Sequence, residues 1–164
     1  MPLNFKQTGS VKVTATWTDA QSLTDIVETA VINPSIALVD GTGNGMANRL
    51  WQFAGTAAAN SSQTLTTNQL AVSVYGGAGQ LSITAVKLVY FINNGAVGLK
   101  FGSWTPFVSS DSASPAWLSV PSGSFVLAGS SEGGWATASD LTMVVQNATT
   151  TACAFSMVLV GVGT

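Results

Sequence analysis

Hydrophobic and polar residues alternate with a period of two along much of this chain. In segment 11–18 (VKVTATWT), one face collects the apolar residues Val11, Val13, Ala15 and Trp17. Successive side chains of a β-strand point to opposite faces, so this pattern predicts a strand with one buried face. The other face is mainly threonine, which is β-branched and adds to the strand preference.

The same alternation returns at 141–145 and 153–159, and segment 83–92 is apolar on both faces except at Lys87. A segment of the latter kind is typical of a central strand that is covered on both sides. Glycine and asparagine, which tolerate the backbone angles of tight turns, separate the runs at 33–34, 40–45, 76–79, 93–95, 121–123, 132–134 and 147–149. The sequence therefore predicts an all-β fold, an antiparallel jelly-roll-like β-sandwich that forms a single domain over residues 1–164.

Segment 22–31 allows two interpretations. Leu23, Ile26, Val27 and Ala30 fall at helical spacing, and a serine three residues before Asp25 resembles a weak capping box. The threonines and valines of the same segment favour a strand instead, and Pro34 ends either element. Both a short helix and a strand remain open here.

Charged residues are scarce. Five Lys and Arg and seven Asp and Glu make up only 7% of the 164 residues, whereas about a quarter is usual. A net charge of -2 provides no field that would attract nucleic acid. The composition therefore predicts either a sheet surface covered by Thr and Ser or a surface that is buried against copies of the chain or a larger assembly, because interface cores are depleted in charge.

The residues of common catalytic and metal sites are also scarce. The chain has no His, which excludes a nucleophile–His–carboxylate triad, and its single Cys153 allows neither an internal disulfide nor a structural zinc site. The seven carboxylates lie mostly beside turns, although two of them would suffice for a glycosidase. We expect no enzymatic activity and no cofactor.

Segment 40–45 (DGTGNG) begins like a calcium-binding loop. Its third position is Thr42 instead of a carboxylate, and its twelfth position, where a bidentate Glu is needed, is Trp51. A hairpin between 35–39 and 48–53 accounts for the same glycines. We therefore expect a turn here and no metal site.

The aromatic residues divide into core and contact candidates. Trp17 and Trp51 lie within strand patterns and are expected in the core, as is Trp135 at a loop-to-strand junction. Aromatic residues in the Pro- and Ser-rich region around 103–117 would either stack on sugars, anchor a subunit interface or cap the core. The chain also starts with apolar residues, and we expect residues 1–10 to form an assembly arm. The candidate contact residues are Pro2, Leu3, Phe5, Trp104, Phe107 and Trp117.

From about Val39 onward the chain resembles a loose family of small tailed-phage and prophage virion proteins. The resemblance rests on the order of segments 41–51 (GTGNGMANRLW), 82–93 (SITAVKLVYFIN), 120–127 (VPSGSFVL), 134–135, 140–147 (DLTMVVQN) and 158–161. It implies a jelly roll or sandwich that decorates a phage head or forms part of a tail. No catalytic or ligand-binding residue comes with it.

The combined expectation is a non-enzymatic phage virion structural protein, a capsid decoration or minor capsid protein made in the host cytoplasm. It would form a homo-oligomer, with a trimer favoured, and contact a major capsid or tail protein. We expect no nucleic-acid partner, because of the low net charge. We expect no membrane partner, since the longest apolar stretch, 152–160, is about half the length of a membrane-spanning helix. The alternative is a carbohydrate-binding module or a tail-associated receptor-binding protein that uses the loop aromatics.

Overall fold

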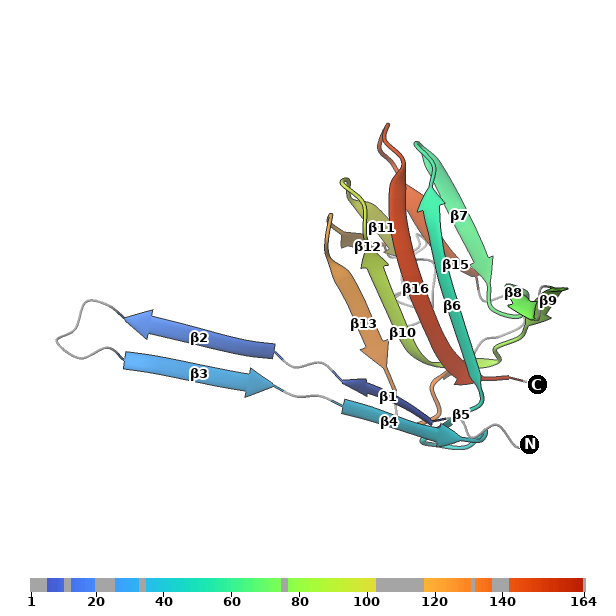
Figure 1. Cartoon of the computed structure of the whole chain (residues 1–164), viewed down its shortest axis with the longest axis horizontal. Helices are drawn as coiled ribbons and strands as arrows, with labels where there is room; N and C mark the ends of the chain where they lie inside the picture. The colour runs from blue at the N-terminus through green and yellow to red at the C-terminus, as the bar shows by residue number, and fades with distance from the viewer. Residues whose placement is uncertain are drawn as a thin grey trace, which may run out of the picture.

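The computed structural model is built of strands (Figure 1). It describes residues 6–10, 13–19, 26–32, 35–74, 77–102, 117–130, 132–136 and 142–163, and side-chain environments within 36–72, 78–102, 117–130, 132–135 and 142–163. No described residue is helical, so this part of the chain holds no helix long and apolar enough to cross a membrane. The all-β prediction is confirmed.

Two antiparallel sheets face each other (Figure 1). The five-stranded sheet has the order β13 (Phe125–Gly129), β10 (Ala85–Asn93), β16 (Cys153–Val162) and β6 (Arg49–Ala57), with β14 (Trp135–Ala136) also paired to β10. The four-stranded sheet has the order β12 (Trp117–Val120), β11 (Leu99–Gly102), β15 (Thr142–Asn147) and β7 (Ser61–Thr66). A short hairpin of β8 (Leu70–Val74) and β9 (Gly77–Leu81) follows β7.

The strand pairs of the two sheets are nested along the chain. β6 pairs with β16 and β7 with β15, while further inward β10 pairs with β13 and β11 with β12. These pairs describe one long antiparallel hairpin. Additional pairing of β10 with β16 and of β11 with β15 folds that hairpin into two facing sheets.

The core lies between the sheets and follows the alternation of the sequence. Along β16, Cys153, Phe155, Met157 and Leu159 are all buried, as predicted, and so are Met143 and Val145 on β15. The rings of Phe91 and Phe101 stack between the sheets with centroids 4.9 Å apart. Trp51 is only 3% exposed and Trp135 is partly buried against the same cluster, so both predictions are confirmed; the side chain of Trp17 lies outside the described set.

Two buried asparagines fix equivalent loops. The amide of Asn93 donates to the carbonyls of Val97 and Val120, and its oxygen accepts from the Gly95 N–H. Asn147 repeats this pattern, donating to Thr151 and Ala57 and accepting from the Thr149 N–H. Each side chain thus holds the loop that follows its own strand and ties it to a residue distant in sequence.

The N-terminal part of the chain forms ribbons outside the sandwich. β4 (Ser35–Asp40) pairs antiparallel with β1 (Lys6–Ser10) and parallel with β5 (Met46–Ala47). β2 (Val13–Asp19) and β3 (Ile26–Ile32) form a separate two-stranded ribbon, here called the arm. It is distinct from the predicted assembly arm of residues 1–10, of which 6–10 form β1 and pair with β4 of the same chain and 1–5 lie outside the described residues. Figure 1 shows the arm extending away from the sandwich. From Ile26 onward the strand interpretation of segment 22–31 is therefore correct.

Three local predictions need correction. Residues 40–45 do form a turn, but the expected hairpin between 35–39 and 48–53 is wrong, because β6 pairs with β16 and β4 with β1 and β5. Gly77 and Gly79 belong to β9 instead of a turn. Trp117, expected in an extended loop, begins β12.

Candidate functional site

The outer face of the five-stranded sheet carries no charged residue among its described positions. Strand alternation and register place on this face Leu50, Gln52, Ala54 and Thr56 of β6, Ala154, Ser156, Val158 and Val160 of β16, Leu88, Tyr90 and Ile92 of β10, and Phe125, Leu127 and Gly129 of β13. We call this set the apolar face. Three of its members, Gln52, Thr56 and Ser156, are polar but uncharged, and the others are aliphatic, aromatic or glycine.

The outer face of the four-stranded sheet provides an internal comparison. The described positions there include Ser62, Thr64 and Thr66 of β7, Thr142, Val144 and Gln146 of β15, Lys100 of β11 and Ser119 of β12. Apart from Val144 and the exposed Trp117, which the register with Gly102 places on the same side, this surface is polar and rich in threonine. Such a surface is usual for the outer face of an antiparallel sheet with one side in water. The two outer faces of the same sandwich therefore differ in chemistry.

Part of the apolar face is already covered within the chain. Leu38 of β4 and Ala47 of β5 form a buried cluster with Leu88 and Val160. Ile36 of β4 packs closely on Gly129, since a Cβ at that glycine would lie 2.1 Å from the Ile36 Cδ1. The β1–β4–β5 ribbon is thus anchored on the same face, which explains why β10 is apolar on both sides.

Outside this covered part, the face is half-buried at Tyr90, Leu127 and Val158 and exposed mainly along the edge strands. Phe125 is 55% exposed and Leu50 is 48% exposed, and the ring of Phe125 lies 6.0 Å from that of Tyr90. Phe125 and Leu50 lie on β13 and β6, the opposite edge strands of the sheet, so large apolar surface is exposed at both sides of this face. This face is the candidate interface.

Lys87 is a buried cation beside the bulge of β10. The register with β16 shifts between Val86 and Leu88, and Lys87 is only 1% exposed. Its ammonium group donates a hydrogen bond to the carbonyl of Glu132. Burial lowers the pKa of Lys87 below its ordinary value of 10.5. In the described part of the chain Lys87 has no carboxylate partner, and no three His, Cys, Asp or Glu side chains come together as a metal site.

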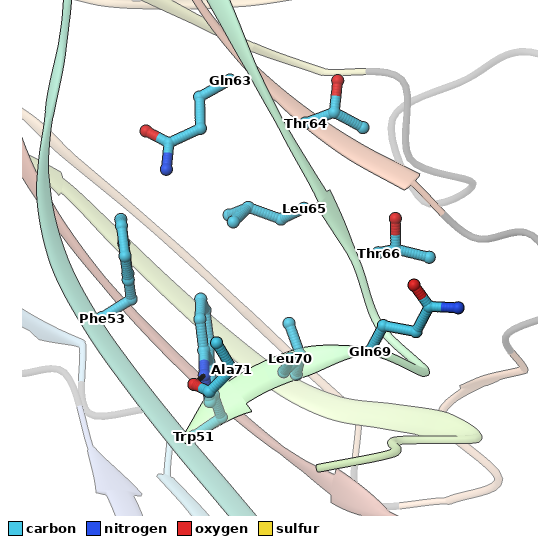
Figure 2. Close-up of a pocket in the computed structure, with 9 residues that line it drawn as sticks. All are labelled: Trp51, Phe53, Gln63, Thr64, Leu65, Thr66, Gln69, Leu70 and Ala71. Atoms are coloured by element: carbon cyan, nitrogen blue, oxygen red, sulfur yellow. Dashed lines mark hydrogen bonds between the residues drawn. The ribbon is translucent and has the colours of Figure 1, made fainter. Parts of the chain in front are cut away.

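A hollow of about 280 Å³, here called the edge pocket, opens between β6 and β7, the edge strands of the two sheets (Figure 2). Figure 2 shows Phe53, Gln63 and Leu65 pointing toward one another across it, whereas Thr64 and Thr66 point to the other side of β7. The indole N–H of Trp51 donates to the carbonyl of Ala71 at 3.0 Å, which ties β8 to β6 at one end of the hollow.

The edge pocket combines aromatic, aliphatic and amide groups. The rings of Trp51 and Phe53 are parallel, with centroids 5.4 Å apart. Leu65 and Leu70 supply aliphatic walls, and Gln63 and Gln69 are the amides of the lining. No described charged residue lines it, which favours a neutral ligand over an ionic one.

The sequence predicted other contact residues. Pro2, Leu3, Phe5, Trp104 and Phe107 lie outside the described residues. Trp117 is 37% exposed on β12, at the edge of the four-stranded sheet and away from the edge pocket. Sequence reasoning missed Phe125, Tyr90, Phe53 and Gln63. The sequence signal for this face was present in segments 86–92 and 125–129. Both faces of these segments are largely apolar, whereas a strand with one face in water would be polar on that face.

No protein-family model matches this sequence, and no curated protein matches it.

Proposed function

We propose that this chain is a non-enzymatic structural protein that assembles through the apolar face, most specifically a capsid decoration or minor capsid protein of a phage virion. The observation that carries the proposal is the absence of charge at the described positions of the apolar face, beside a mainly polar outer face on the other sheet. In a monomer with both outer faces in water, no difference in polarity between the two faces would be needed. A sandwich that buries one face in an assembly requires such a difference.

We further propose that the sandwich is a jelly roll. The support is the nested pairing of β6 with β16, β7 with β15, β10 with β13 and β11 with β12, which is the arrangement of a rolled-up hairpin. Jelly rolls are common in viral capsid and lectin domains. The fold is therefore compatible with a virion protein but does not by itself select that function.

The arm supports an oligomer. A two-stranded ribbon is marginally stable in water unless it packs against another element. β2 and β3 pair only with each other in the described chain, and β4, which continues the arm into the body, already packs on the apolar face. We propose that the arm of one copy covers the open part of the apolar face on the next copy. On the basis of the resemblance to phage virion proteins, we propose that the oligomer binds to a phage particle and that its partner there is a major capsid or tail protein.

The test is a charge placed on the exposed part of the apolar face, at the edge strand β13. Phe125→Glu puts a carboxylate on the apolar face at an exposed position, so the monomer should fold but the oligomer should dissociate. Ser62→Glu puts the same charge on the outer face of the four-stranded sheet and should leave the oligomer intact. Native mass spectrometry and sedimentation velocity measure both. A parent protein that is monomeric at high micromolar concentration, with no affinity for phage particles, would contradict the proposal.

A further inference from the structure

We propose that the edge pocket binds one neutral pyranose ring that carries a methyl group, such as an N-acetylhexosamine or a 6-deoxyhexose. This binding activity is separate from the proposed assembly function, because the inward-facing residues of β6 line the pocket while its outward-facing residues belong to the apolar face. One strand therefore serves both surfaces.

The size of the edge pocket limits the ligand. Pockets for drug-sized molecules begin at roughly 300 Å³, and this one holds about 280 Å³. It therefore suits a single sugar ring better than a long oligosaccharide. Its walls belong to two different sheets, so a bound ring would contact β6 on one side and β7 on the other.

The apolar walls fit the C–H surface and the methyl group of such a sugar. Figure 2 shows the ring of Phe53 edge-on, with one face turned toward Leu65 across the hollow, and Leu70 pointing in from β8. Trp51 stacks on Phe53 and is held by its bond to Ala71, so the aromatic wall is fixed before a ligand arrives. Preorganisation of this kind lowers the entropic cost of binding.

The polar groups fit sugar hydroxyls. The half-buried amide of Gln63 points into the hollow and has no hydrogen-bond partner in the described part of the chain. An amide both donates and accepts, as a hydroxyl does. Within the described residues β6 and β7 are edge strands, so each presents backbone N–H and C=O groups along a side where no described strand pairs with it.

A strand from another protein chain is the competing occupant of two adjacent edges. An average strand of five to six residues spans roughly 17–20 Å, but the hollow is bounded by only residues 51–53 of β6 and 63–66 of β7 on its long sides. The compact outline favours a single ring over an added strand.

The experiment is saturation-transfer NMR on the full chain with a panel of free sugars. N-acetylglucosamine, N-acetylgalactosamine and rhamnose should bind with a Kd of about 1 mM, a modest affinity for a one-ring ligand. Glucose, which lacks the methyl group, should bind more weakly, and the anionic sialic acid should not bind. Gln63→Ala should weaken binding about fivefold to tenfold, as expected for one or two lost hydrogen bonds. Gln52→Ala, the same change on the opposite face of β6, should leave binding unchanged.

Two outcomes would overturn the proposal. One is no saturation transfer to any neutral sugar at about 50 mM, well above a millimolar Kd. An edge pocket that is filled by a neighbouring chain in the oligomer would give this same result. The other is binding that Gln63→Ala and Phe53→Leu both leave unchanged. The dissociating variant Phe125→Glu should still bind sugar, so a failure of the assembly proposal and a failure of this one give different results.

Discussion

At the scale of single residues, Lys87 departs furthest from the environment its chemistry favours. The sequence marks it as the one exception in an apolar segment, but its burial depends on two features that no local pattern contains. The bulge between Val86 and Leu88 changes the direction of the side chain. The stem then passes close to Gly134, where a Cβ would lie 2.7 Å from the Lys87 Cδ.

We predict that Lys87→Met stabilises the protein at neutral pH by about 1–4 kcal/mol, as apolar replacements of buried charged groups often do. The lowered pKa of Lys87 means that the unfolded chain binds more protons than the folded one between that value and 10.5. Wild-type stability should therefore rise with pH through this alkaline window, and the advantage of the variant should shrink there. Urea unfolding at several pH values measures both effects.

The control for this prediction is Lys100→Met. Lys100 is exposed on β11, so removing its charge should change the free energy of unfolding by no more than about 0.5 kcal/mol at any pH. If Lys87→Met were destabilising at pH 7 by more than its control, the hydrogen bond to Glu132 would outweigh the cost of burying the ammonium group.

At the scale of elements, alternation predicts where strands lie but not with which strands they pair. It located β15 and β16 and the buried side of each, because the pattern is local to the strand. Alternation predicted the wrong partner for β4. The turn residues at 40–45 are compatible both with an antiparallel hairpin and with the short parallel pairing of β4 with β5. Only the register with β1 and β5 distinguishes these cases.

Close packing around β16 gives a prediction at the same scale. A Cβ at Gly161 would lie 2.3 Å from the carbonyl oxygen of Ala85 on β10, which is backbone and cannot easily move aside. Gly161→Ala should therefore destabilise the protein by about 1–3 kcal/mol. Gly98→Ala, with nothing within 4 Å of its Cβ position, is the matched control and should unfold like the parent in urea. Equal midpoints for the two variants would show that β10 and β16 are less tightly paired than described.

At the scale of the whole molecule, the nested order of the strand pairs could not be predicted from local sequence patterns. The partners in each outer pair, such as β6 with β16, lie at opposite ends of the body sequence. Short strands with Gly and Asn turns predict a sandwich, but the same strands admit many orders of pairing. The apolar face was equally hidden, because it forms only after β13, β10, β16 and β6 lie side by side.

The arm gives the last prediction. Ser10 and Ser35 face each other at the end of the β1–β4 ladder, so residues 11–34 can be replaced by an Asn-Gly turn that closes a two-residue hairpin. The sandwich should remain folded, with a free energy of unfolding per monomer within about 0.5 kcal/mol of the dissociated parent variant Phe125→Glu. The oligomer should be lost, because the open part of the apolar face on each copy would have no arm from a neighbour to cover it. Sedimentation velocity that still shows the parent oligomer after this excision would mean that the sheets contact each other directly and that the arm has a different partner.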